Sequence, residues 1–135
     1  MSKQTSVILP IKIGDEWQVE LTEFVVQTLR MRTKQKFELI IAESGSNHLK
    51  SLADKHLKCK KESNYVVDFN QAIELASHEY IVHTALDIIV GDQWLEALHE
   101  PFTLFDDCGV STTSVCEPAD RDWETIYSCD ASSIA

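Results

Sequence analysis

The sequence lacks long apolar runs and closely spaced cysteines. No stretch approaches the roughly 18 uninterrupted apolar residues of a membrane-spanning helix. The first residues lead into a strand-like run without the apolar segment of a signal peptide. The four cysteines show no Cys-x-x-Cys spacing, which argues against a zinc site and a disulfide framework and favours free thiols. We therefore predict a cytoplasmic protein with no membrane span.

Several common catalytic and cofactor motifs are also missing. The sequence has no Gly-x-Gly-x-x-Gly, no phosphate loop and no Gly-x-Ser-x-Gly element. The usual sequence marks of dinucleotide-binding proteins, NTPases and α/β-hydrolases are therefore absent. The five histidines form no pair with zinc-like spacing, so ordinary surface or core positions are favoured for them.

Basic residues are nearly absent from the second half of the chain. Eleven of the twelve Lys and Arg residues precede position 62, whereas fifteen of the twenty-two acidic residues lie from position 62 onward. This distribution argues against a nucleic-acid partner, because Lys and Arg contacts to phosphates dominate that affinity. A metal ion would suit the acidic half, and the alternative is solvated surface charge.

A chain of 135 residues with 44% hydrophobic residues is typical of one compact domain. We predict a domain over residues 1–116 and an acidic C-terminal tail over residues 117–135, which we expect to be partly disordered.

Strand-like and helix-like patterns alternate along the chain. Predicted strands cover residues 6–9, 37–42, 65–67, 80–86 and 109–115. Predicted helices lie between them. The first carries an apolar face of Trp17, Leu21, Phe24, Val25 and Leu29. A second covers 46–57, a third opens at Asp68, and a fourth is capped by Asp92. This alternation predicts an α/β protein with three layers, α/β/α, and a mostly parallel sheet.

In open parallel sheets, ligands bind beyond the carboxyl ends of the strands. The residues placed there are Pro10, Ile11, Glu43, Ser44, Asp68, Asn70 and Asp87. Glu43 and Asp87 each end a long apolar strand, where an unpartnered carboxylate would be desolvated. Asp87 suits a hard-cation ligand or, equally, a loop cap. Glu43 suits a hydrogen-bond acceptor for a base or ribose, or a carboxylate at the mouth of a Gly turn. We expect the two carboxylates to converge on one pocket.

Four segments in order, residues 6–10, 37–46, 70–81 and 87–98, resemble successive blocks of family 2 glycosyltransferases with the GT-A fold. The resemblance covers roughly residues 5–115, the nucleotide-binding half of that fold. It implies that Pro10, Ile11, Glu43, Ser44 and Asn70 contact the nucleotide of a nucleotide-diphospho-sugar. It also implies that Asp87, matching the last acid of the Asp-x-Asp motif, binds Mn²⁺ or Mg²⁺.

Our first hypothesis is a metal-dependent glycosyltransferase that transfers the sugar to the hydroxyl of an unknown acceptor, with unassigned catalytic residues. The second is a non-catalytic sugar-nucleotide-binding or interaction module. It rests on Ala85 at the first acid of Asp-x-Asp, on Phe69 where the family often has Arg, and on a chain expected to end before the acceptor-binding half. The catalytic base of the family belongs to that missing half. Candidates to replace it are three acidic residues of the tail, Asp120, Asp122 and Glu124. A third hypothesis is a flavodoxin-like module. An uncovered sheet edge would favour a homodimer.

Overall fold

The computed structural model describes residues 3–113. The described residues form two compact units, residues 3–31 with 35–89, and residues 32–34 with 90–113. The elements in chain order are β1 (Thr5–Lys12), α1 (Glu16–Met31), β2 (Glu38–Ser44), the short 3-10 helix η1 (Lys50–Leu52), β3 (Lys55–Cys59), α2 (Tyr65–Leu75), β4 (Tyr80–His83) and α3 (Trp94–Leu104). The predicted domain boundary at residue 116 and the predicted tail lie outside the described residues.

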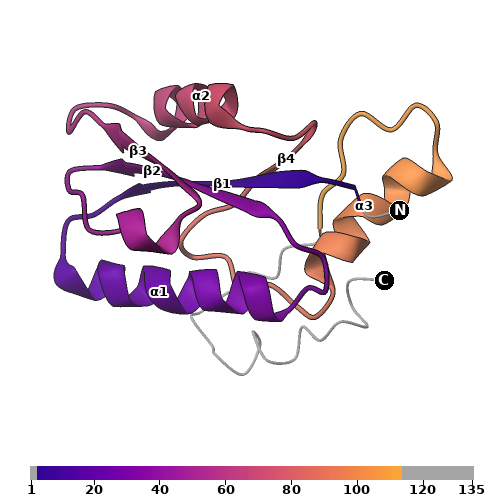
Figure 1. The fold of residues 1–135 in the computed structure, drawn as a ribbon, viewed down its shortest axis with the longest axis horizontal. Helices are drawn as coiled ribbons and strands as arrows, with labels where there is room; N and C mark the ends of the chain where they lie inside the picture. The colour runs from indigo at the N-terminus through magenta and orange to yellow at the C-terminus, as the bar shows by residue number, and fades with distance from the viewer. Residues whose placement is uncertain (1–2, 114–135) are drawn as a thin grey trace, which may run out of the picture. The chain divides into compact units, whose positions relative to one another are not determined.

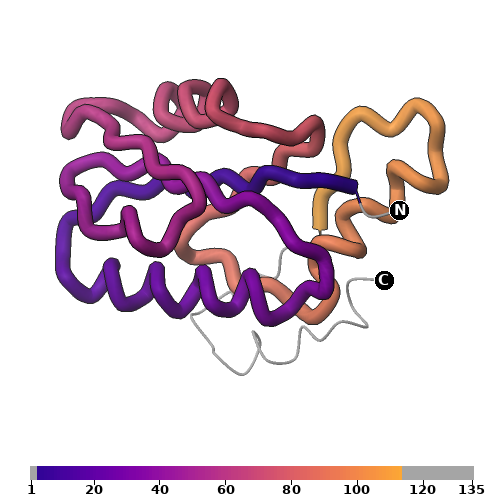
Figure 2. Tube along the Cα trace, viewed as in Figure 1, coloured from indigo at the N-terminus to yellow at the C-terminus, as the bar shows by residue number. Residues whose placement is uncertain are grey.

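The first unit is built on a four-stranded sheet in the order β3-β2-β1-β4, in which every neighbouring pair is parallel. Helices α1 and α2 lie on opposite sides of this sheet (Figure 1). The α/β class and the parallel sheet predicted from the sequence are therefore confirmed. The loops that follow β1, β2 and β3 gather at one end of the unit, on the left in Figure 2.

The two central strands carry the core. Residues 5–9 of β1 and residues 39–44 of β2 are all buried, as expected for strands covered on both faces. On one face, Ile8, Ile40 and Ala42 pack against Ala72 of α2. Successive side chains of a strand point to opposite faces, so Leu39 and Ile41 lie on the α1 side.

Helix α1 buries only part of the predicted apolar face, Val25 and Leu29. Its buried residues are Thr22, Val25, Val26 and Leu29, whereas Trp17 and Phe24 are more than half exposed. Thr22 tolerates burial because its hydroxyl donates to the carbonyl of Gln18 over 2.6 Å. The apolar residues of this helix are spread around much of its circumference, so the spacing of apolar residues alone could not identify the buried face.

The prediction for the region between β2 and α2 was wrong. Residues 46–57 were expected to form a helix, but they contain only the single turn η1 followed by strand β3. Residues 65–67, expected as a strand, are the first turn of α2. Its N-cap is Asn64, whose side chain accepts from the backbone N–H of Val67 over 3.1 Å, whereas Asp68 was expected in that role.

The second unit contains α3, which is held to residues 32–34 by polar contacts. The side chain of Glu96 accepts from the hydroxyl of Thr33 and from the backbone N–H of Lys34, each over 2.8 Å. The N-cap residue is Gln93, with a left-handed φ of 59°, and not Asp92 as predicted. The strand predicted over residues 109–115 is not formed in its described part, residues 109–113. Among the described residues, no helix is long and apolar enough to cross a membrane.

Candidate functional site

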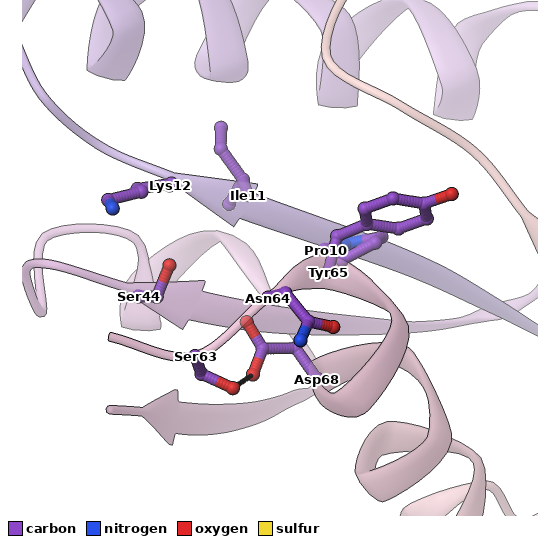
Figure 3. A pocket seen from close by; sticks show the side chains of 8 residues that line it. All are labelled: Pro10, Ile11, Lys12, Ser44, Ser63, Asn64, Tyr65 and Asp68. Carbon is purple, nitrogen blue, oxygen red and sulfur yellow. Dashed lines mark hydrogen bonds between the residues drawn. The ribbon is translucent and has the colours of Figure 1, made fainter. Parts of the chain in front are cut away.

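A cavity of about 250 Å³ lies at the carboxyl ends of β1 and β2, facing the start of α2 (Figure 3). It is lined by Pro10, Ile11, Lys12, Ser44, Ser63, Asn64, Tyr65 and Asp68. The parallel pairing of β1 with β2 brings Pro10 opposite Ala42 and Lys12 opposite Ser44, so both strands end at this cavity. This is the position at which open α/β sheets bind ligands.

The start of α2 supplies the polar wall of the cavity. The first turn of a helix leaves backbone N–H groups without helical partners and carries a partial positive charge. Asn64 satisfies one of these groups through its side-chain oxygen. Its amide nitrogen donates no hydrogen bond to any residue within 3–113. A donor on the helix cap therefore borders the cavity.

Asp68 is a second polar group of this wall, and it is 3% exposed. The hydroxyl of Ser63 donates to its Oδ1 over 2.5 Å, whereas the Cys59 thiol donates to the carbonyl of Leu57 over 3.8 Å. Burial and the neighbouring Asp68 carboxylate raise the pKa of the Cys59 thiol to about 12. Cys59 is therefore a neutral structural group, and Asp68 is the acidic residue of a cavity lining that also includes Lys12.

Glu43, the predicted base contact, is fully buried and does not line the cavity. Its Oε1 accepts from the backbone N–H of Leu49 over 3.0 Å and lies 2.8 Å from Nε2 of His56. Its Oε2 accepts from the backbone N–H of His48 over 2.9 Å and from the hydroxyl of Ser46. Burial alone would raise the pKa of Glu43, but these hydrogen bonds outweigh burial and hold the pKa below its usual value. The carboxylate thus organises the loop that follows β2.

Asn70 and Asp87 also lie outside the cavity lining. Asn70 is exposed on α2, and Asp87 is exposed in the turn after β4. Asp87 makes no hydrogen bond or ion pair with any residue in the described part of the chain. Strand β1 lies between β2, which carries Glu43, and β4, which precedes Asp87. The structure brings Pro10, Ile11 and Ser44 together and leaves Glu43, Asn70 and Asp87 outside their cavity.

An aromatic group lies at the carboxyl end of β4. The ring of Phe69 is 4.4 Å from that of His83 between centroids, and the ring of Tyr65 stacks on His83 at 6.2 Å. Desolvation by the neighbouring groups lowers the pKa of His83 below its usual value. Tyr65 links this group to the cavity, which it also lines.

Sequence reasoning missed several cavity residues: Lys12, Ser63, Asn64 and Tyr65. The available signal was the Ser63 and Asn64 pair before an apolar run, because both residue types are preferred at helix N-caps. No protein-family model matches the chain, and no curated protein matches it.

Proposed function

We propose that this chain binds the nucleotide of a nucleotide-diphospho-sugar in the cavity at the ends of β1 and β2, and that it acts as a metal-dependent glycosyltransferase. The observation that carries the proposal is the cavity lining. Pro10, Ile11 and Ser44, three residues that the family resemblance implies as nucleotide contacts, meet there at the start of a helix. Ile11 contributes its backbone, because its side chain points toward the α1 side of the sheet (Figure 3).

The topology supports a diphosphate position next to this cavity. From β1 the chain passes through α1 to β2, which pairs with one edge of β1. After β3 and α2 the chain returns, and β4 pairs with the other edge of β1. The order of strands therefore reverses between β1 and β4, and such switch points open a crevice at the carboxyl ends of the strands. Asp87 follows β4 on this side of the sheet.

A divalent cation would have Asp87 as its proposed protein ligand, outside the cavity lining. The described residues hold no group of three or more His, Cys, Asp and Glu side chains that could bind a metal ion. Asp87 is one exposed carboxylate without a partner among them. It suits an Mn²⁺ or Mg²⁺ ion that arrives with the diphosphate, whose oxygens and water fill the remaining positions. Such a cation stabilises negative charge on a departing nucleoside diphosphate.

In the proposed reaction, the hydroxyl of the acceptor attacks the anomeric carbon of the sugar with inversion. A new carbon–oxygen bond forms, the bond to the diphosphate breaks, and the hydroxyl proton passes to a carboxylate base. The described residues do not assign this base, and Asp120, Asp122 and Glu124 lie outside them.

A second candidate is a sugar-nucleotide-binding module without turnover. Two observations favour it. Ala85 removes the first acid of the Asp-x-Asp pair, so Asp87 has no neighbouring carboxylate in that motif. Phe69, at the position where the family often has Arg, packs against His83 and offers no charge to a phosphate.

Thermal melting with nucleotide sugars tests both candidates. At one hundred times its dissociation constant, a ligand stabilises the folded state by about 2.7 kcal/mol, which raises the Tm of a domain of this size by roughly 10 °C. We expect such a rise with at least one nucleotide sugar, and a further rise with Mn²⁺. Asp87→Asn removes the Mn²⁺ dependence, whereas the exposed control Asp106→Asn retains it.

A chain that shows no rise with any nucleotide contradicts the proposal. Retention of the Mn²⁺ dependence in Asp87→Asn removes Asp87 from the metal site. Release of free nucleoside diphosphate from the bound donor then separates the glycosyltransferase from the binding module.

A further inference from the structure

We propose that helix α1 is a self-association surface, through which two copies of this chain pair as a weak antiparallel dimer. The surface is a second apolar stripe of the helix, separate from its buried face. We call it the α1 stripe, and its residues are Trp17, Leu21, Phe24, Thr28 and Met31. Helix α1 lies on the side of the sheet opposite α2 (Figure 1), so the start of α2, which borders the cavity, lies away from this surface.

The spacing within the α1 stripe is that of a coiled-coil seam. Its five residues are separated by four, three, four and three positions, which places them on one face of the helix. The buried residues of α1, Thr22, Val25, Val26 and Leu29, occupy a different face. The helix therefore has one apolar face for the fold and a second for which the described residues supply no cover.

The α1 stripe is exposed although its side chains are large and apolar. Trp17 is 58% exposed, Phe24 is 55% exposed and Met31 is 74% exposed. The hydroxyl of Thr28 donates to the carbonyl of Phe24 over 2.9 Å, so Thr28 brings no unpaired polar group to the stripe. Single exposed apolar residues are common on proteins, but a contiguous row of them marks an interaction surface.

The charges of α1 favour an antiparallel second copy as the occupant. Its acidic residues, Glu16, Glu20 and Glu23, lie in the first half, whereas Arg30 lies in the last turn. Two further basic residues follow within four positions of Arg30. Parallel copies would place acids against acids, but antiparallel copies place the acidic half of each helix beside the basic end of the other. The helix dipoles are then also opposed, which is favourable.

Other occupants match these charges less well. Amphipathic helices that bind membrane surfaces carry Lys and Arg on their polar face, whereas α1 carries three acids and one Arg. Residues 114–135, which lie outside the described part of the chain, contain five acids and one Arg, so their charge repels the first half of α1. A second copy is the occupant whose charge complements both ends of the helix.

The size of the α1 stripe predicts a weak dimer. Trp17 and Phe24 each offer on the order of 100 Å² of apolar surface, because each is about half exposed. With Met31 added, two copies bury less than the roughly 1,200 Å² of a typical stable complex. Interfaces of this small class are transient, so we expect monomer and dimer to exchange rapidly.

Sedimentation velocity of the full chain over a range of concentrations tests the inference. We expect a reversible shift from monomer to dimer as the concentration rises. Phe24→Gln, in the middle of the α1 stripe, should raise the dissociation constant of the dimer about tenfold or more. Ile89→Gln is the matched control, because Ile89 is 56% exposed and lies outside α1, and it should leave the constant unchanged. Circular dichroism checks that both variants keep the fold.

A double-mutant cycle tests the antiparallel orientation. Trp17 and Met31 are separated by about 21 Å along one helix, so they do not contact each other within one copy. In the antiparallel dimer, Trp17 of one copy lies beside the partner's Met31. The double variant Trp17→Ala/Met31→Ala should therefore weaken the dimer by less than the product of the two single effects. A double effect equal to that product overturns the antiparallel arrangement.

Three other results overturn the inference. A chain that stays monomeric at millimolar concentration leaves residues 114–135 as the candidate occupant. A dimer that Phe24→Gln leaves intact, or that Phe24→Gln and Ile89→Gln weaken equally, forms through another surface. Flotation of the chain with phosphatidylcholine vesicles, lost in Phe24→Gln, assigns the α1 stripe to a membrane.

Discussion

Removal of the Glu43 carboxylate should strongly destabilise the protein. This side chain is fully buried at the end of β2 and accepts hydrogen bonds from the loop of residues 45–49 and from His56. In Glu43→Ala, the backbone N–H groups of His48 and Leu49 lose their acceptor. Leu49 has no exposed surface, so water cannot replace that acceptor without local rearrangement.

The magnitude follows from the number and type of these contacts. A hydrogen bond to a charged group contributes about 1.5–3 kcal/mol. The full sum is not expected, because the loop can relax where Asn47 and His48 are exposed. Each backbone N–H that loses its acceptor costs about 1–3 kcal/mol, and with the lost contact to His56 we expect Glu43→Ala to cost about 3–5 kcal/mol. Glu43→Gln keeps the shape and one acceptor oxygen, so it should cost about 1–3 kcal/mol.

Urea unfolding, followed by circular dichroism, measures these differences. A loss of about 4 kcal/mol lowers the urea midpoint by about 2 M for a protein of this size. The control Glu74→Ala removes an exposed glutamate and should change stability by no more than about 0.5 kcal/mol. A loss below about 1 kcal/mol in Glu43→Ala, with an unchanged slope of the transition, would refute the structural role assigned to this carboxylate.

Two further predictions concern titrating groups. Burial alone would raise the pKa of Glu38, but the Lys55 ammonium and hydrogen bonds from Ser6 and Ser77 outweigh it and lower the pKa from 4.5 to about 2. The carboxylate form therefore stabilises the fold fully above pH 4.5, and this contribution is lost as the pH falls toward 2. Urea midpoints over this interval should fall less steeply in Glu38→Gln, and identical slopes would contradict the assignment. The thiol of Cys59, with its pKa of about 12, should react with iodoacetamide much more slowly than the partly exposed Cys108 at pH 8, as read by peptide mass spectrometry. Equal labelling in the folded protein would contradict the burial of Cys59.

The elements that could be predicted from the sequence are those with strong local signals. Strands β1 and β2 are continuous apolar runs, which suit strands buried on both faces, and both were placed within a few residues. Strand β3 could not be found in this way. Residues 55–59 contain two lysines and one histidine, and they form a strand because β2 offers a free edge with a matching register. Such pairing is a tertiary effect that local propensity does not encode.

The candidate site was predicted only where it is formed by strands with strong local signals. The ends of β1 and β2 followed from the strand predictions, which placed Pro10, Ile11 and Ser44 correctly at one end of the sheet. The wall made by α2 was missed because residues 65–67 are β-branched and aromatic, a composition typical of strands. The Asn64 cap and the packing of Ala72 against the sheet select the helix instead.

The central claim is that the cavity between the strand ends and α2 binds a nucleotide. Titration of the isotope-labelled chain with UDP and GDP, followed by amide NMR shifts, tests it residue by residue. The account predicts saturable shifts concentrated at Ile11, Lys12, Ser44, Asn64 and Asp68, the backbone that surrounds the cavity. Shifts confined to α3, or unchanged spectra with both nucleotides at millimolar concentration, would contradict it.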